Sequence, residues 1–227
     1  MTFQWYISRL SRMSPREVLH RCWRATAEPW VRRRILACTL PCAVEDICAS
    51  ADVAVSGIPS DTRMPDIDAN YAADVKCAAD RARAGRLTFF DTTRENGTAL
   101  DWYHDPHTGV TLPRVPADTI NYRHCDEVGD IMYFWWLHRH QFLTPAAIHY
   151  CISGDDAYAE SVVARISSWL DACAYPNGPG WMTGIEAGIR LLTWSWLFRF
   201  LMSRGRPACM TDAFLAATAK TPVRLVV

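Results

Sequence analysis

Helical periodicity dominates the sequence beyond residue 130. The break SGDD at 153–156 predicts that one helix ends at Gly154 and that Asp155 or Asp156 caps the next. A second break, YPNGPG, follows at 175–180. Apolar residues recur at helical spacing on either side of it, first Val162, Val163, Ile166, Trp169 and Leu170, then Ile185, Ile189, Leu192 and Trp196. Short connections between such helices favour antiparallel hairpins, so the sequence predicts a mainly α fold.

The other segments are more varied. Ser14-Pro15-Arg16-Glu17 is typical of a helix start, and that helix is expected to reach about Arg34, with Pro29 bending or ending it. Residues 39–69 are predicted to form a loop. The stretch NYAADVKCAADRARAG predicts a helix stopped by Gly85, and RLTFFD has strand character. Residues 91–128 are loop-rich, and residues 131–150 form one helix or two, depending on Thr144-Pro145. We therefore expect N-terminal helices and a loop over 1–90 and helix hairpins over 91–227, in one continuous domain.

Composition excludes several classes of partner. Lys plus Arg equals Asp plus Glu at 24 each, so the net charge of the 227-residue chain gives no general attraction to nucleic acid or an anionic membrane. The start lacks the apolar core of a secretory signal, and the apolar run 191–198 is too short to cross a bilayer, which favours a soluble, cytoplasmic protein. Nine cysteines include Cys38, Cys42 and Cys48, but no CxxC pair, which indicates scattered thiols and no zinc site.

One segment mixes large aromatic rings with polar groups. Tyr133, Phe134, Trp135, Trp136 and Phe142 surround the run His138, Arg139, His140 and Gln141. In one interpretation, Arg139 and His140 project into a groove and bind anionic sugar. In the other, Arg139 joins helices through a buried carboxylate, for which Glu186 is the expected partner. Metal binding is not expected, because His138 and His140 point to different sides of a helix and no second cluster supports His104 and His107.

Two further groups of residues are candidates for a site. Glu186 and Arg190 have the spacing of an intrahelical ion pair, or they border a sugar platform formed by Trp181. Asp101, Trp102, His104 and Asp105 line a cleft rim, or Asp105 shapes the turn before Pro106. Both alternatives stay open in each case.

Four motifs together resemble one family. DWYHDPHTG, GDIMYFWWLHRHQF, SGDDAYAESVVARISSWLDA and GWMTGIEAGIRLLTWSW are similar, in order and spacing, to the N-terminal domain of heparinase II/III-like proteins, and RLSRMSPREVLHR looks like the first helix of that family. The resemblance implies an incomplete (α/α) toroid of antiparallel helix hairpins, followed by a β-sandwich. It also implies β-elimination on acidic polysaccharides that contain uronic acid, without a cofactor, and a periplasmic or exopolysaccharide-related setting.

The resemblance also implies what this chain lacks. The Asn, Tyr and His that act in such lyases align downstream of GIEAGIRLLTWSW, so no catalytic residue is assigned here. Met132, Trp136 and His138 stand where the family usually has Lys, Glu and Asn, which removes a potential ion pair one turn apart. With half of the toroid missing, we expect an apolar patch around Leu191, Leu192, Trp196 and Phe200 without neighbours.

Three hypotheses follow from these observations. The chain is the N-terminal toroid portion of a lyase, inactive without the missing C-terminal toroid half and β-sandwich; or it is a non-catalytic module that binds acidic glycan; or it is a structural relic without a ligand. The residues expected to bind substrate are Trp102, His104, Arg139, His140, Gln141, Trp181, Glu186 and Arg190.

Overall fold

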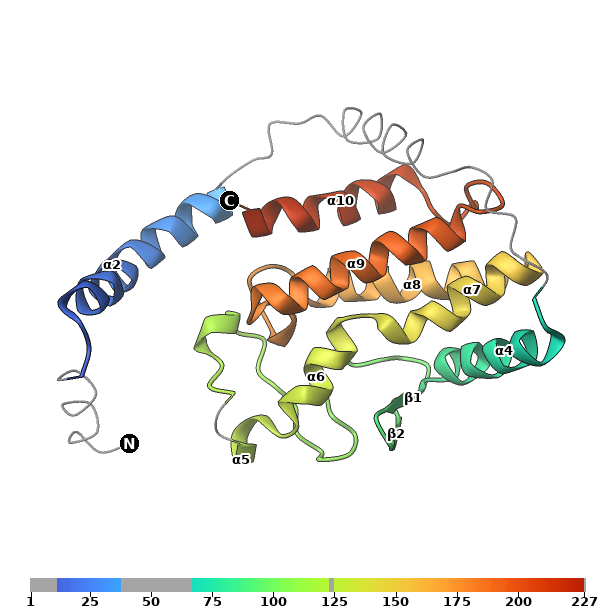
Figure 1. The fold of residues 1–227 in the computed structure, drawn as a ribbon, viewed down its shortest axis with the longest axis horizontal. Helices are drawn as coiled ribbons and strands as arrows, with labels where there is room; N and C mark the ends of the chain where they lie inside the picture. Colours follow the sequence, from blue (N-terminus) through green and yellow to red (C-terminus); the bar gives the residue numbers. More distant parts are fainter. Residues whose placement is uncertain (1–11, 38–66, 123–124, 227) are drawn as a thin grey trace. The chain divides into compact units, whose positions relative to one another are not determined.

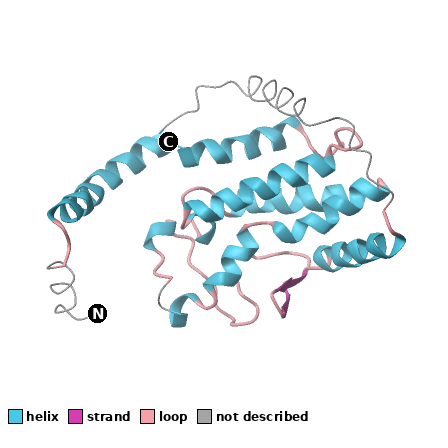
Figure 2. Cartoon of the chain, in the orientation of Figure 1, coloured by secondary structure: helices cyan, strands magenta, loops and turns pink. Residues whose placement is uncertain are grey.

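The computed structural model describes residues 12–37, 67–122 and 125–226. Most of the loop expected over 39–69, and Cys38, Cys42 and Cys48, lie outside the described residues. The elements are α2 (Pro15–Ala37), α4 (Ala69–Arg83), β1 (Arg86–Phe89), β2 (Thr92–Glu95), η1 (Ala117–Thr119), α5 (Cys125–Val128), α6 (Ile131–His138), η2 (Gln141–Leu143), α7 (Thr144–Ser153), α8 (Asp156–Ala172), η3 (Pro179–Trp181), α9 (Gly184–Leu201) and α10 (Asp212–Val226). Helices account for most of the described chain (Figure 2), so the mainly α class is confirmed.

Helix α2 belongs to one compact unit, and every other described element belongs to a second. The predicted start of α2 is confirmed, because Ser14 Oγ accepts a hydrogen bond from the Glu17 backbone N–H at 3.2 Å. The helix continues through Pro29 to Ala37, so Pro29 does not end it. Whether residues 1–90 form a region of their own stays a prediction.

In the second unit, α7 contacts α4, α8 and α9, and α10 contacts α8 and α9. Consecutive helices from α7 to α10 run in alternating directions (Figure 1), as expected for helix hairpins. Gly154, at φ 72°, ends α7, and the Asp155 carboxylate caps α8 by accepting from the Ala157 N–H at 3.0 Å. The predicted stop and restart at SGDD is therefore confirmed.

The segment after α4 forms a small antiparallel sheet. Gly85, at φ 79°, follows α4, and β1 pairs with β2 from Arg86 opposite Glu95 to Phe89 opposite Thr92. The strand character of RLTFFD is confirmed, whereas β2 lies in a segment expected to be loop. β2 is short, and its pairing depends on β1, which the local pattern of residues 92–95 does not reveal.

Helix α9 buries the face that the apolar pattern did not indicate. Its buried side chains include Glu186, Arg190 and Trp194, while Ile185, Leu192 and Trp196 are 69%, 66% and 55% exposed. The apolar stripe predicted from the spacing of these residues is therefore a surface of this chain and not part of its core. The expected exposed patch is present at Leu192 and Trp196, and Leu191 and Phe200 are half-buried.

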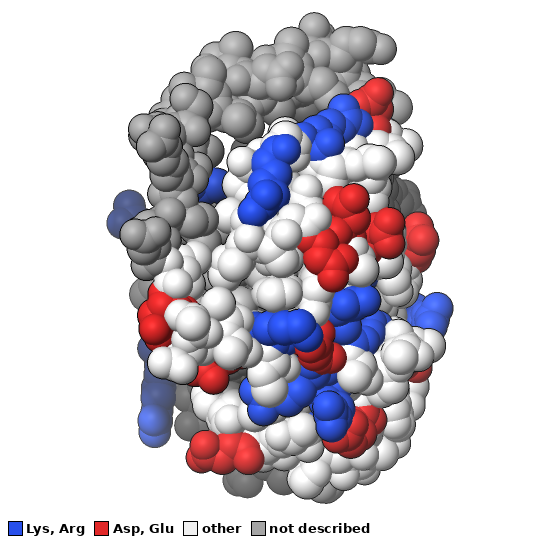
Figure 3. All heavy atoms as spheres, turned by 90° about the vertical axis from the view of Figure 1, so that its right-hand side faces the viewer, with Lys and Arg blue, Asp and Glu red and all other residues white. Residues whose placement is uncertain are grey.

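Charges of both signs occur on the face that Figure 3 shows. Lys and Arg side chains on this face are interspersed with Asp and Glu side chains. None of the described helices combines the length and the apolar character needed to cross a membrane. Among the described cysteines, Cys22, Cys77, Cys151, Cys173 and Cys209 are free thiols.

Candidate functional site

The aromatic segment folds into two helices, not one. Asp130 caps α6 by accepting from the Tyr133 N–H at 3.2 Å, and α6 ends at His138. His140 then adopts the left-handed conformation, at φ 63°, before η2 and α7. The reversal at His140 separates α6 from α7, and Thr144 begins a new helix. Both His138 and His140 are fully buried as a result.

Indole N–H groups hold the two histidines as neutral rings. Trp169 Nε1 donates to His138 Nδ1 at 2.8 Å, so His138 Nε2 carries the proton and donates to the Trp102 carbonyl at 2.9 Å. Trp194 Nε1 likewise donates to His140 Nδ1 at 2.8 Å. Burial lowers the pKa of His138 from 6.5 to about 3, and burial with the nearby Arg190 charge lowers the pKa of His140 well below 6.5. Neither ring reaches the solvent from which a glycan would come.

Arg139 forms the pair that the sequence predicted. Its Nε and Nη2 donate to the two carboxylate oxygens of Glu186 at 2.7 and 2.9 Å, joining the end of α6 to the start of α9. The side chains are 15% and 4% exposed. The hypothesis that Arg139 joins helices through Glu186 is confirmed.

Arg190 does not pair with Glu186, although the spacing of these residues is that of an intrahelical ion pair. Its Nη1 donates to the carbonyls of His138 and Gly180 at 3.2 and 3.1 Å. Its guanidinium carbon lies against the rings of Trp169 and Trp181, at 4.2 and 4.6 Å from their centroids. Burial lowers the pKa of Arg190 to about 10. Of the two alternatives for these residues, the intrahelical ion pair is wrong, because Glu186 is engaged by Arg139 and Arg190 points into the core.

Among the other predicted residues, Gln141 and His104 take no part in the contacts described above, whereas Trp181 borders Arg190. Gln141 is exposed, and His104 Nδ1 lies 2.9 Å from Thr111 Oγ1. Trp181 is half-buried, and its Nε1 donates to the Cys173 carbonyl at 2.8 Å. Within residues 12–37, 67–122 and 125–226, no group of three or more His, Cys, Asp or Glu is arranged to hold a metal ion.

Asp105 shapes the predicted turn and also belongs to a buried ion pair. Its carboxylate accepts from the His107 N–H at 3.0 Å and from Thr108 Oγ1 at 2.8 Å. Arg94 donates from Nε to Asp105 at 2.9 Å and from Nη2 to Asp130 at 2.8 Å. Burial alone would raise the pKa of Asp105, but these donors outweigh it and hold that pKa below the usual 3.8.

Glycine is required at two positions of the loop before α9, one beside Tyr103 and one beside His138. A Cβ at Gly178, whose φ is 89°, would lie 2.6 Å from the Tyr103 hydroxyl oxygen. A Cβ at Gly180 would lie 2.6 Å from His138 Nδ1. The loop before α9 therefore packs against the core through its backbone.

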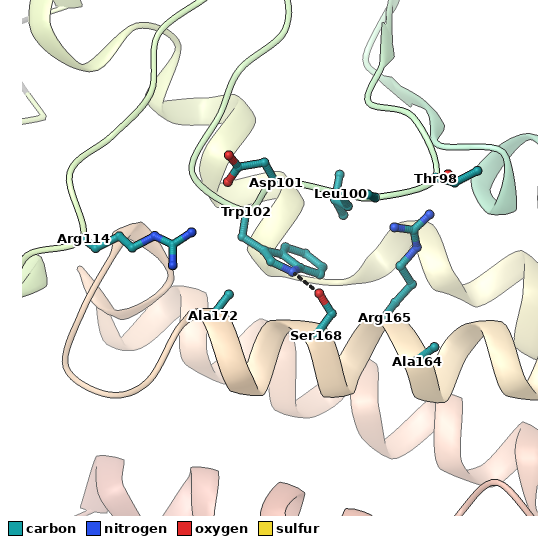
Figure 4. A pocket seen from close by; sticks show the side chains of 10 residues that line it. Thr98, Leu100, Asp101, Trp102, Arg114, Ala164, Arg165, Ser168 and Ala172 are labelled. Atoms are coloured by element: carbon teal, nitrogen blue, oxygen red, sulfur yellow. Dashed lines mark hydrogen bonds between the residues drawn. The ribbon is translucent and has the colours of Figure 1, made fainter.

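Trp102 lines a cavity of about 410 Å³, which we call the Trp102 pocket. The pocket lies between the loop that carries Trp102 and one side of α8, and it is lined by residues that include Asp101, Trp102, Arg114, Ala164, Arg165 and Ser168. Trp102 Nε1 donates to Ser168 Oγ at 3.1 Å, which fixes the indole against α8. Arg114 and Arg165 lie at opposite ends of the pocket, with Trp102 between them (Figure 4). Two guanidinium groups against one carboxylate favour an anionic ligand.

Sequence reasoning identified Trp102 and Asp101 in this pocket, but not Arg114, Arg165 or Ser168. Arg165 and Ser168 lie on α8, the helix predicted to follow SGDD, where an outward-facing Arg or Ser carries no distinguishing pattern. Arg165 is half-buried, and burial lowers its pKa. Arg114 lies in the loop-rich segment, with its guanidinium carbon 5.1 Å from the centre of the Tyr103 ring.

A second cavity, of about 430 Å³, lies between α8, the loop before α9, and α10. We call it the α8–α10 pocket, and its lining includes Trp169, Asp171, Tyr175, Trp181, Ala217 and Lys220. Trp181, expected to face a sugar, thus lines a cavity, but a different one from Trp102.

Comparison with known protein families gives a match for most of the chain. Residues 61–221, well over half of the 227 residues, match the family described as heparinase II/III N-terminus. Comparisons with curated proteins and with solved structures found no match. The matched range begins before α4 and ends within α10, so it includes both pockets and the buried histidines. The chain belongs to the heparinase II/III N-terminal family.

Proposed function

We propose that this chain is the N-terminal toroid portion of a lyase that cleaves uronic-acid-containing polysaccharide by β-elimination, and that its own part is to bind the acidic glycan. Family membership supports the reaction class. The alternating helices from α7 to α10 are compatible with the first hairpins of an α/α toroid. The observation that carries the binding role is the Trp102 pocket, with its two arginines.

The pocket suits a uronate for electrostatic and steric reasons. Arg165 is half-buried, and burial lowers its pKa, so a carboxylate beside its guanidinium would stabilise the charged form. Its Nη2 donates to the Arg83 carbonyl at 3.5 Å, a long hydrogen bond. A guanidinium binds a carboxylate through two parallel hydrogen bonds. Ser168 Oγ already accepts from Trp102, and its own hydroxyl hydrogen is available for a sugar oxygen. Arg114, at the other end of the cavity, is placed to meet a second acidic group on the same chain.

The chemistry of elimination needs a base and an acid in addition to a group that binds the carboxylate. A base must remove the proton at C5, a cationic or amide group must stabilise the carboxylate, and an acid must protonate the leaving oxygen. His138 and His140 are buried and bonded to indoles. Burial raises the pKa of Tyr103 and of Tyr133, whose hydroxyls donate to the Ala172 carbonyl and the Asn96 side chain. These contacts support a binding role for the chain and a separate origin for the catalytic groups.

Arg165→Gln is expected to weaken the binding of acidic oligosaccharides by roughly tenfold or more, since it removes a partly desolvated cation. Isothermal titration calorimetry at low salt with tetrasaccharides of heparan sulfate, alginate and hyaluronan measures the affinity and identifies the preferred glycan. Arg81→Gln is the matched control, because it makes the same change of charge at an exposed position of α4.

A steric variant distinguishes binding in the Trp102 pocket from general electrostatic attraction. Ala164→Leu places a larger side chain in the Trp102 pocket without altering charge, and it is expected to reduce acidic binding as Arg165→Gln does. Ala217→Leu lies in the other pocket and is expected to leave acidic binding unchanged. Equal affinity in wild type, Arg165→Gln and Ala164→Leu would overturn the proposed site. An absence of binding to all three glycans would favour the structural alternative.

The purified 227-residue chain is expected to show no lyase activity on the same polysaccharides, because its described residues do not bring a base and an acid together at the pocket. The measurement follows the ultraviolet absorbance of the unsaturated uronate product. Binding without product supports a glycan-binding role for this chain. Steady accumulation of product above a boiled control would contradict the expectation.

A further inference from the structure

Arg190 is a buried cation for which the described residues offer no ion-pair partner. Its side chain is 0% exposed, and the acid one turn before it, Glu186, binds Arg139 through both carboxylate oxygens. The guanidinium is surrounded by the rings of Trp169 and Trp181 and by two backbone carbonyls. A buried charge without a counter-ion is costly, so this position favours a negative partner.

One edge of the Arg190 guanidinium has the geometry of an anion site. Nη1 donates to the carbonyls of His138 and Gly180, whereas Nε and Nη2 are buried and have no hydrogen-bond partner among the described residues. Nε and Nη2 are also the two atoms with which Arg139 binds the Glu186 carboxylate, because their N–H groups are parallel. The same edge of Arg190 is therefore ready to bind an acceptor that carries negative charge.

His140 contributes a further donor near Arg190. Trp194 Nε1 donates to His140 Nδ1, so the proton of the neutral ring is on Nε2, which is buried and unpartnered within the described part of the chain. Trp169 contacts both residues, at 5.2 Å from the His140 ring and 4.2 Å from the Arg190 guanidinium carbon. All three unpartnered groups are N–H donors. An anion accepts from such groups without further needs, whereas a water molecule brings two hydrogens that require acceptors of their own.

The packing around Arg190 limits the size of the anion. A Cβ at Gly180 would already lie 3.2 Å from Nη1, and two indole rings lie against the guanidinium. We propose that the Nε–Nη2 edge of Arg190 binds one small monovalent anion, chloride, within the core. The ion neutralises the guanidinium and stabilises the packing of α9 against the turn at His140. This site uses no residue that lines the Trp102 pocket, so it does not depend on the proposed glycan binding.

Thermal unfolding at constant ionic strength tests the site. The protein is refolded from urea without chloride, and sodium gluconate, whose anion is too large for the packed core, is then exchanged stepwise for sodium chloride. Chloride at about ten times its dissociation constant is expected to raise the melting temperature by roughly 3–5 °C, because it binds only the folded chain. Arg190→Met removes both donors of the edge and is expected to abolish this shift.

Arg199→Met is the matched control. Arg199 also lies on α9 with its guanidinium carbon against an indole, 5.8 Å from the centre of the Trp196 ring, but Trp196 is exposed. This variant is expected to keep the chloride shift of the wild type. A shift present in wild type and Arg199→Met but lost in Arg190→Met supports the proposal. No shift in the wild type, or an equal shift in Arg190→Met, overturns it.

Crystals of the wild type grown with bromide in place of chloride decide the matter if Arg190→Met does not fold. Bromide is used at the concentration that raises the melting temperature of the wild type in solution. An anomalous peak in hydrogen-bonding contact with Nε and Nη2 of Arg190 supports the proposal. A water molecule at that position, without anomalous signal, overturns it.

Discussion

Acidification from about pH 6 to about pH 5 is expected to lower the free energy of unfolding by roughly 2–3 kcal/mol through His138 and His140 alone. Both folded-state pKa values lie below the ordinary 6.5, that of His138 at about 3. Between about pH 6.5 and about pH 3 the unfolded chain therefore binds protons that the folded chain does not. The stabilisation that comes from keeping these histidines neutral is fully present above this window. It falls as the pH is lowered through the window, by about 1.4 kcal/mol per pH unit for each histidine. Urea denaturation at a series of pH values measures this slope.

His140→Asn is the variant that isolates this effect. Asn tolerates the left-handed backbone at position 140, and its Oδ1 is suited to accept the Trp194 indole N–H in place of Nδ1. Removal of one of the two groups is expected to reduce the slope by about half, whatever the substitution costs in packing. His107→Asn is the matched control, since that exposed side chain meets water in both states. A slope in His140→Asn equal to that of wild type would show that His140 is not buried as a neutral ring.

Arg139→Ala is expected to destabilise the fold by roughly 3–5 kcal/mol, mainly because it leaves the carboxylate of Glu186 buried without its partner. The pair is nearly inaccessible, and its two hydrogen bonds are short. Chemical denaturation at neutral pH measures the change. An unchanged melting temperature in this variant would contradict the assignment of Arg139 to an internal role.

Two comparisons sharpen this result. The double variant Arg139→Met/Glu186→Leu removes both charges and is expected to be more stable than Arg139→Ala alone. Lys76→Ala breaks an ion pair with Asp80 whose side chains are 54% and 44% exposed, and it is expected to leave stability close to that of wild type. If Lys76→Ala costs as much as Arg139→Ala, burial is not the source of the effect.

The parts of the fold that depend on neighbouring residues were predictable from the sequence. Ser14 before Pro15, Gly154 before Asp155, and Thr144-Pro145 mark helix ends through capping and backbone geometry, which act over a few positions. The Arg139–Glu186 pair was also predictable, since a guanidinium among aromatic rings needs an acid and Glu186 lies in another of the motifs that resemble the family.

The parts that depend on contacts between distant segments were not predictable in this way. Helix α9 turns Glu186 and Arg190 inward because they form hydrogen bonds there, Glu186 with Arg139 and Arg190 with two backbone carbonyls. The spacing of apolar residues alone therefore indicated the wrong face of α9 as the buried one. Strand β2 and the buried Arg94–Asp105 pair likewise depend on long-range packing. The arginines of the Trp102 pocket come from a loop and from α8, and only the fold brings them to one cavity.

The close packing at Gly178 and Gly180 limits which substitutions this chain tolerates. A side chain at the first position would collide with Tyr103, and a side chain at the second would collide with His138. The backbone of the loop before α9 therefore works as a spacer, because its missing side chains set how closely that loop approaches the two buried rings.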